Sequence, residues 1–184
     1  MRAYHHGHLR SALMEAAIAA LTAGEEPSLR ELARRVGVAP SAVYHHFADK
    51  DALIAAVATE GFATLGAAQR ALTAEDPRER LVALGMGYVR FAVEHPGQFG
   101  VMFRAELKDA ARYPALAAAA DETFAVLLDA TTALDPSASP ERALALWAMA
   151  HGLAELVRRG PLVAKLGERW PAFVETTLRR EVGG

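Results

Sequence analysis

The chain has 184 residues, 52% apolar and 23% charged, so it can bury a core and is too apolar to be disordered. It has no cysteine, which excludes disulfides, thiolate metal sites and a cysteine nucleophile, and suits a reducing cytoplasm. No N-terminal apolar run is typical of a signal peptide, and no stretch of about 18 uncharged apolar residues predicts a membrane span.

The net charge of −2 argues against a generally basic coat for nucleic acid. Residues 1–50 nevertheless hold six Lys and Arg against five Asp and Glu, together with five of the seven histidines. The rest of the chain is more acidic, with fourteen basic residues against seventeen acidic ones. This mild asymmetry permits a small DNA contact surface near the N-terminus.

Helix-start and helix-stop residues follow one another along the whole chain, and no period-2 strand is present, which predicts an all-α fold. The expected helices cover residues 8–23, 28–35, 40–47, 50–72 and 77–94, one or two short helices within 98–109, and residues 114–134, 140–159 and 171–182. Ser28 with Glu31 forms a predicted capping box, Pro40 suits a first helical position, and Asp49 suits an N-cap.

The second and third helices are joined by a tight turn, residues 36–39, with Gly37 inside it, which is the spacing of a helix-turn-helix. Val43 and Phe47, four residues apart, give the third helix an inner apolar face. Its outer face then carries Ser41, Ala42, Tyr44, His45 and His46. Short polar and aromatic side chains on such a face suit the DNA major groove, although helical hairpins without DNA function have the same spacing.

The block from Ser28 to Leu53 resembles the DNA-binding signature of the TetR family of transcriptional regulators, in the skeleton Leu-Ala, Val-Gly-Val, Tyr-x-His-Phe and Lys-x-x-Leu. Residues 4–10 are similar to the start of many members. Residues 147–152, Trp-Ala-Met-Ala-His-Gly, resemble the Trp-x-x-x-His-Gly motif of one class of C-terminal ligand domain in that family, and residues 91–99 fit the same class.

The resemblance implies DNA roles for eight residues. Phosphate contacts are implied for Ser28, Tyr44, His46 and Lys50, a phosphate or base contact for Arg30, and groove contacts for Ser41, Ala42 and His45. The chain departs from the family pattern at Ala39, where a capping Ser is common, and at Leu29, where a Thr is frequent.

Alternatives remain open for these side chains. Tyr44 and His46 could be exposed polar residues, and Lys50 could be a solvated charge. Arg34 and Arg35 are expected to lie on a solvated helix face.

The histidines do not have the pattern of a metal site. Histidines 5, 6 and 8 have no nearby Asp, Glu or Cys to complete a site, and His45 and His46 lie 100° apart on a helix, so one ion cannot bridge them. The first cluster could instead be an arm near DNA or a disordered lead-in. We also find no nucleophile elbow, phosphate loop or dinucleotide turn, so neither an enzyme nor a cofactor is expected, and Gly85-x-Gly87 is interpreted as helix packing.

The resemblance implies that the C-terminal helices enclose a cavity for a largely apolar or aromatic ligand. The candidate lining residues are Phe91, Phe99, Met102, Phe103, Phe124, Trp147 and His151. Ordinary core packing is the alternative for most of them. Trp147 and His151 are four residues apart on one helix face, and His151 could supply one polar contact.

The resemblance also implies a homodimer through the last two long helices, where Ala145, Ala148 and Gly152 allow close helix approach. The expected domains are residues 1–52, with the helix-turn-helix core at 28–47, and residues 53–184. The expected function is a cytoplasmic repressor that an effector releases from a palindromic double-stranded DNA operator. The alternatives are a ligand-independent DNA-binding protein and a metal-responsive regulator that uses the N-terminal histidines.

Overall fold

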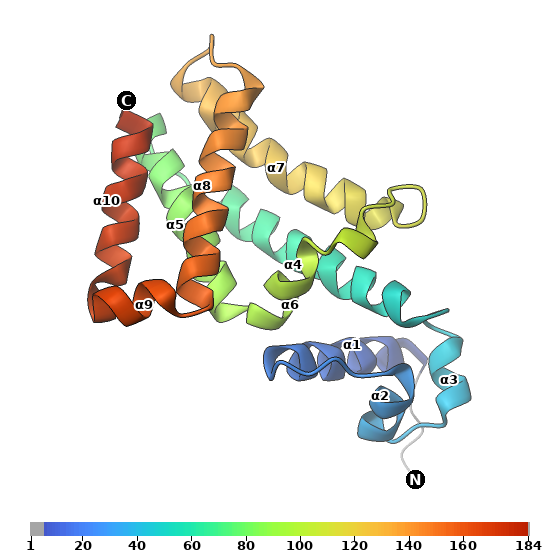
Figure 1. The fold of residues 1–184 in the computed structure, drawn as a ribbon. Coiled ribbons are helices and arrows are strands. Elements are labelled where there is room, and N and C mark those ends of the chain that lie inside the picture. Colours follow the sequence, from blue (N-terminus) through green and yellow to red (C-terminus); the bar gives the residue numbers. More distant parts are fainter. Residues whose placement is uncertain (1–5, 184) are drawn as a thin grey trace. The chain divides into compact units, whose positions relative to one another are not determined.

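The computed structural model describes residues 6–183, and within them the chain is all-α, as predicted (Figure 1). The α-helices are α1 (His6–Thr22), α2 (Leu29–Val36), α3 (Pro40–Tyr44), α4 (Lys50–Ala71), α5 (Pro77–Glu94), α6 (Pro96–Met102), α7 (Pro114–Leu134), α8 (Pro140–Arg158), α9 (Pro161–Leu166) and α10 (Trp170–Gly183). Two short 3-10 helices, η1 (Ala105–Leu107) and η2 (Gly167–Arg169), complete the series.

Some of the expected helix boundaries were wrong, and one helix was missed. The recognition helix α3 ends at Tyr44, and His45 and His46 form a turn that continues it, with the His46 N–H donating to the Val43 carbonyl at 2.9 Å. Helix α6 begins at Pro96, two residues before the expected start. Helix α9 was not predicted at all.

The chain divides into two compact units. The first comprises Met1–Phe62 with His95–Ala118, and the second comprises Ala63–Glu94 with Ala119–Gly184. Helices α4 and α7 each have residues in both units. The division that we expect for function, residues 1–52 and 53–184, stays a prediction about roles.

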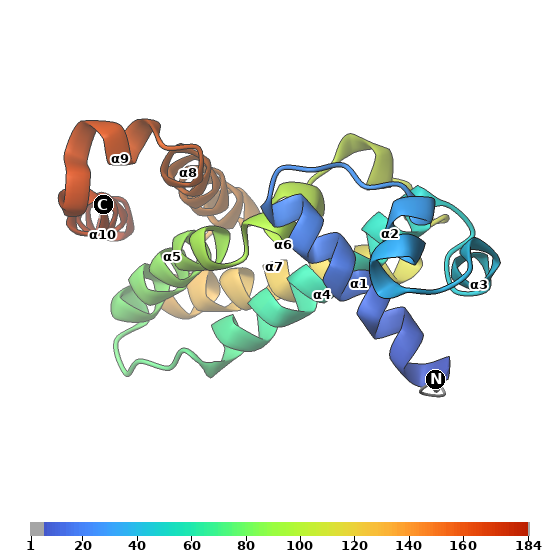
Figure 2. The same ribbon diagram turned by 90° about the horizontal axis from the view of Figure 1, so that it is seen from below.

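The first unit is built on α1, which packs against α2 and α6, while α2 packs against α3 (Figure 2). A Cβ atom at Gly97 would lie 2.5 Å from the Thr22 hydroxyl oxygen and 2.7 Å from the Ile18 carbonyl oxygen. Only glycine therefore permits this approach of α6 to α1. Position 61 also favours glycine, since a Cβ atom at Gly61 would lie 2.8 Å from the Met102 sulfur.

The second unit centres on α5, which packs against α8 and α10. A Cβ atom at Gly85 would lie 2.6 Å from a methyl carbon of Leu178, so the glycine lets α10 approach α5 closely. This confirms the interpretation of Gly85 as a packing residue. The Arg78 guanidinium also donates to the Val182 carbonyl at 2.9 Å, which ties the start of α5 to the end of α10.

Helix α4 is long and apolar enough to cross a membrane by length and composition alone, with a mean hydropathy of 1.2 over its most apolar window, although it contains no stretch of about 18 uncharged residues. Half of that window is buried inside the protein. A helix in the core of a globular domain is also apolar and buried, so length and hydropathy alone are weak evidence for a membrane segment.

Candidate nucleic-acid interface

Helix α2 begins with the predicted capping box. The Ser28 N–H donates to a Glu31 carboxylate oxygen at 2.7 Å, and the Glu31 N–H donates to the Ser28 hydroxyl oxygen at 3.3 Å. The helix ends at Gly37, whose φ of 80° lies in the left-handed region and turns the chain towards α3. The Gly37 and Val38 N–H groups both donate to the Ala33 carbonyl at 2.9 Å. Both ends of α2 are thus fixed by hydrogen bonds.

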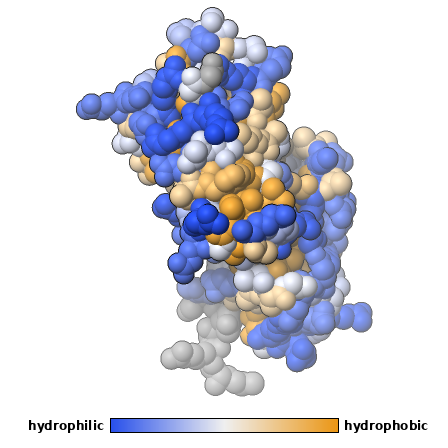
Figure 3. Space-filling model, turned by 60° about the vertical axis from the view of Figure 1, so that its left-hand side comes forward, coloured by the Kyte–Doolittle hydropathy of each residue, from blue (hydrophilic) through white to orange (hydrophobic). Residues whose placement is uncertain are grey.

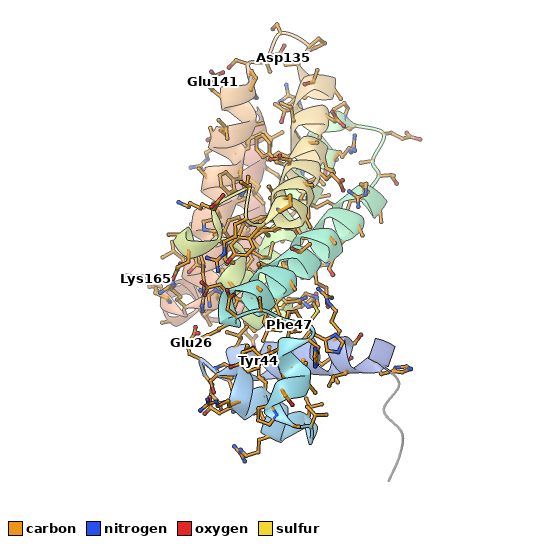
Figure 4. The ribbon with its side chains drawn as sticks, turned by 90° about the vertical axis from the view of Figure 1, so that its right-hand side faces the viewer. Glu26, Tyr44, Phe47, Asp135, Glu141 and Lys165 are labelled. Carbon is orange, nitrogen blue, oxygen red and sulfur yellow. The ribbon has the colours of Figure 1, made fainter. Side chains whose placement is uncertain are left out.

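Helix α3 has the two faces that the sequence predicts. Val43 and Phe47 are buried, at 0% and 3% exposure, whereas Ser41, Tyr44 and His45 are exposed. Tyr44, labelled in Figure 4, is 52% exposed, which is unusual for a large aromatic side chain. Ala42 and His46 are partly exposed. The N-cap residue Ala39 makes no side-chain cap, as its departure from the family pattern implies.

Helix α1 places a cation beside the end of α3. The Arg10 guanidinium carbon lies 5.2 Å from the centroid of the Phe47 ring, within the range of a cation–π contact. One of its nitrogens also lies 3.2 Å from the Met14 sulfur. Arg30 on α2, for which a phosphate or base contact is predicted, is exposed.

Lys50, the predicted phosphate contact at the start of α4, is held in an ion pair. Its ammonium donates to Glu26 Oε2 at 2.8 Å. The Arg104 guanidinium, which follows α6, contacts both oxygens of the same carboxylate. Hydrogen bonds from Arg104, and then from Lys50, lower the pKa of Glu26 to about 2, so its carboxylate is charged at neutral pH.

Neither Glu26 nor Arg104 was identified from the sequence. Glu26 stands next to Glu25 before a capped helix, where a carboxylate is unremarkable. Arg104 is remote in the chain, and no local pattern indicates that it meets Glu26.

A second ionic contact lies at the N-terminus of α4. The Asp49 carboxylate accepts from the Ala52 N–H at 2.7 Å, which confirms it as the helix cap. Its other oxygen accepts from Arg112 at 2.9 Å, and Arg112 lies 3.7 Å from Asp51. The segment 95–118 therefore contacts the start of α4 directly through Arg112, and Arg104 is linked to Lys50 only through Glu26.

The predicted effector residues are divided between the two units. In the first unit, the Phe103 ring makes edge-on contacts with Phe62 and Phe99, with ring centroids 5.3 Å and 5.6 Å apart. Phe99 and Met102 are buried, and Phe103 is partly exposed.

In the second unit, a chain of polar contacts runs through a residue that the sequence reasoning missed, Tyr88 on α5. The Trp147 indole N–H donates to the Tyr88 hydroxyl oxygen at 3.3 Å, and that hydroxyl lies 2.8 Å from His151 Nδ1. The Phe124 ring centroid lies 6.3 Å from that of Trp147, which brings three of the predicted residues together. Phe91 is buried on α5.

Burial favours the uncharged forms of Tyr88 and His151. It lowers the pKa of His151 and raises the pKa of Tyr88, so both are neutral at pH 7. An indole N–H can only donate, so the Tyr88 oxygen accepts from Trp147 and its own proton can be donated to His151. The imidazole proton then lies on Nε2. A tyrosine within an apolar helix is a signal for a buried hydroxyl group. The partners of Tyr88 are remote in the chain, so the sequence does not indicate which residues bind it.

Helices α8, α9 and α10 carry several exposed apolar side chains. They are Leu144, Leu156, Val163 and Phe173, each between 39% and 46% exposed. Figure 3, which brings the side of these helices forward, shows apolar side chains gathered on one face. Gly152 on α8 is exposed, and a Cβ added to it would meet nothing within 4 Å. A further helix could therefore approach this part of α8.

The second unit also has an open cleft of about 430 Å³, lined by Arg70, Arg80, Glu122, Ala125, Val126 and Asp129. None of the predicted effector residues lines it. Among the residues that the structure describes, no group of three His, Asp or Glu side chains could hold a metal ion. His5 and the side chain of His6 lie outside the described part, so the N-terminal arm and its metal alternative stay predictions.

Comparison with known proteins identified two family models. Residues 14–57 match "Bacterial regulatory proteins, tetR family", and residues 81–180 match "Tetracyclin repressor-like, C-terminal domain". The search of curated proteins found no match.

Several solved structures are similar over nearly the whole chain. A protein of unknown function from Rhodococcus sp. RHA1 is 29% identical, with a TM-score of 0.85 and coverage of 100% of this chain and 98% of that one. A tetR-family regulatory protein from Rhodococcus RHA1 is 22% identical, with a TM-score of 0.74 and coverage of 95% and 96%. A TetR-family transcriptional regulator from Bordetella parapertussis is 20% identical, with a TM-score of 0.65 and coverage of 96% and 95%. The last two likenesses concern the fold alone.

Proposed function

Because the chain belongs to the TetR family of transcriptional regulators, we propose that it is a repressor that a small, largely apolar ligand releases from a palindromic operator. The observation that carries the proposal is the division of α3 and the turn that follows it into two faces. Val43 and Phe47 are buried, whereas Ser41, Tyr44 and His45 are exposed. A short helix with capped neighbours and an exposed polar face is the element that enters a major groove.

On this proposal, α3 reads base edges while the surrounding residues position the domain on phosphates. His45 and Ser41 supply hydrogen-bonding groups, and Ala42 supplies a methyl group that suits the methyl of thymine. Ser28, Arg30, Tyr44, His46 and Lys50 face phosphate oxygens. The Ser28 hydroxyl oxygen already accepts from the Glu31 N–H, and the Ser28 N–H donates to the Glu31 carboxylate, so the group that Ser28 offers to a phosphate is its hydroxyl proton.

We propose a homodimer through α8 and α10. The exposed apolar side chains Leu144, Leu156 and Phe173, together with the open surface at Gly152, support this interface. A twofold dimer presents two recognition helices and matches half-sites about 34 Å apart on one face of DNA.

The effector is proposed to contact apolar side chains and the neutral Tyr88–His151 pair. Such a pair offers hydrogen bonds without a net charge, which suits a ligand with one polar group on an apolar body. Helix α4 carries residues of both compact units and begins at Lys50, so a shift of α4 would change the placement of the DNA-binding helices.

Regulators of this family are generally not enzymes, and a DNA-binding regulator of this kind works in the cytoplasm. We propose both for this chain.

The function is tested by selecting duplexes from fragmented genomic DNA with the purified protein and footprinting those that it retains. We expect one or a few fragments with protection over an inverted repeat. Retention of all fragments alike would favour a ligand-independent DNA-binding protein. A parallel thermal-shift screen with apolar ligands should find a compound that raises the unfolding temperature and releases the DNA.

A further inference from the structure

The carboxylate of Glu26 is hydrogen-bonded to the ammonium group of Lys50, which we expect to contact a DNA phosphate. Glu26 lies between α1 and α2 (Figure 4), and its Oε2 accepts from Lys50 at 2.8 Å. A carboxylate oxygen and a phosphate oxygen are equivalent acceptors for a lysine ammonium. Moreover, a phosphate that approaches Lys50 also approaches the negative charge of Glu26.

We infer that Glu26 competes with DNA phosphate for Lys50 and that Arg104 sets the strength of this competition. The inference rests on the proposed DNA-binding function and goes beyond it, because Arg104 lies outside the helix-turn-helix. It assigns a positioning role to two residues that do not contact DNA themselves.

The role of Arg104 follows from charge. Its guanidinium contacts both oxygens of Glu26 and therefore neutralises the carboxylate while Lys50 turns to a phosphate. Without Arg104, Glu26 would have only Lys50 as its ion-pair partner in this cluster, and its negative charge would repel the phosphate. Arg104 thus favours DNA binding through Glu26.

The position of Arg104 in the chain connects this cluster to the proposed effector residues. Arg104 follows Met102 and Phe103 at the end of α6, and Phe99 lies on the same helix. A movement of α6 would therefore withdraw or restore the Arg104 contact. When Arg104 withdraws, Glu26 would hold Lys50 more strongly, and when Arg104 returns, Lys50 would be free to contact a phosphate. This electrostatic effect adds to the change in helix placement.

The first test compares Glu26→Gln with a matched control, Glu25→Gln. Glu25 is the neighbouring residue, has a side-chain exposure of 50% against 49% for Glu26, and is also ion-paired, with Arg35. Both variants remove one charge from the same connection between α1 and α2. Glu26→Gln weakens the contacts with Lys50 and Arg104, whereas Glu25→Gln weakens the contact with Arg35 and leaves Lys50 paired. Affinity is measured by fluorescence anisotropy on a labelled duplex that the unmodified protein selects from genomic DNA.

We expect Glu26→Gln to bind roughly two- to fivefold tighter per half-site than Glu25→Gln, the range of an exposed ion pair. This gain should vanish in a Lys50→Met background. Equal affinities for the two glutamine variants would overturn the inference.

The second test examines Arg104→Met alone and in the Glu26→Gln background. We expect weaker DNA binding in the first case and a smaller loss in the second, because the charge that Arg104 neutralises is then absent. Equal losses in both backgrounds would show that Arg104 acts independently of Glu26, either by attracting DNA directly or by stabilising the fold. That result would overturn the inference. Unfolding temperatures of all variants identify any change in folding.

These outcomes are distinct from a failure of the proposed function. If the unmodified protein binds no duplex at low salt, the function fails and the inference with it. If the unmodified protein binds DNA and the two glutamine variants bind it with equal affinity, only the inference fails.

Discussion

The side chains of the Tyr-His-His triplet at residues 44–46 show how far a local pattern can be interpreted. Val43 and Phe47 are apolar and four residues apart, so they predict the buried side of α3, and both are buried. The triplet between them must then face outward or sideways, as Tyr44 and His45 do. The same reasoning could not find Glu26 with Arg104, or Tyr88 with His151, because those contacts join residues far apart in the chain.

His45 is the residue for which we predict sequence discrimination. Replacing His45 with Ala should cost about 1–3 kcal/mol on a selected operator and little on a scrambled duplex, because a base contact carries specificity. The unfolding temperature should stay unchanged, since the side chain is exposed. Equal losses on the two duplexes, measured by anisotropy, would assign His45 to phosphate instead.

Two buried tyrosines provide a matched pair for the contribution of a hydroxyl group. Tyr88→Phe removes the acceptor for Trp147 and the partner of His151, so we expect a loss of about 1 kcal/mol in the free energy of unfolding. The hydroxyl oxygen of Tyr113 is buried without a hydrogen-bond partner among the described residues, so Tyr113→Phe should be neutral or stabilising. Urea denaturation measures both, and a larger loss for Tyr113→Phe would contradict this account.

At the scale of elements, caps and prolines predicted most of the helices because their signals are local. Ser28, Asp49 and Pro114 stand where the sequence placed them, at helix starts. Helix α9 was missed because Gly160-Pro161 was interpreted only as a stop. The proline is in fact the first residue of a new helix, and Gly160 with φ of 95° turns the chain into it.

The turn between α2 and α3 should depend on the backbone freedom of Gly37. At Gly37 and at Gly100 on α6, an added Cβ would meet nothing within 4 Å, but only Gly37 has a positive φ. We expect Gly37→Ala to destabilise the protein by about 1–2 kcal/mol and Gly100→Ala to be neutral or stabilising. Thermal unfolding measures both, and equal effects would refute a requirement for the left-handed conformation.

For the whole molecule, the sequence predicted the fold class but not how the chain divides into compact units. The segment 95–118 belongs with the N-terminal residues although it follows α5 in the chain, because Gly97 lets α6 pack on α1. Helical periodicity identifies the apolar face of a helix but not the helix that covers it. The sequence therefore paired Trp147 with His151 on one helix face but did not predict that the effector residues divide between the two units.

The proposed dimer gives a prediction at the same scale. Leu156→Glu on α8 should shift the protein towards monomer, because a charge would be buried in the interface. Val93→Glu on α5 is the control, since Val93 is 42% exposed against 44% for Leu156. Sedimentation velocity measures the oligomeric state, and a dimer that survives Leu156→Glu would exclude this face.

The central claim, that the exposed face of α3 recognises a specific DNA sequence, is tested most directly by a competition experiment at several salt concentrations. The purified protein is titrated onto its selected operator in the presence of a scrambled duplex of the same length and composition. We predict a preference for the operator of roughly a thousandfold or more, with both affinities falling steeply as salt rises. Equal affinities for the two duplexes at every salt concentration would contradict the claim.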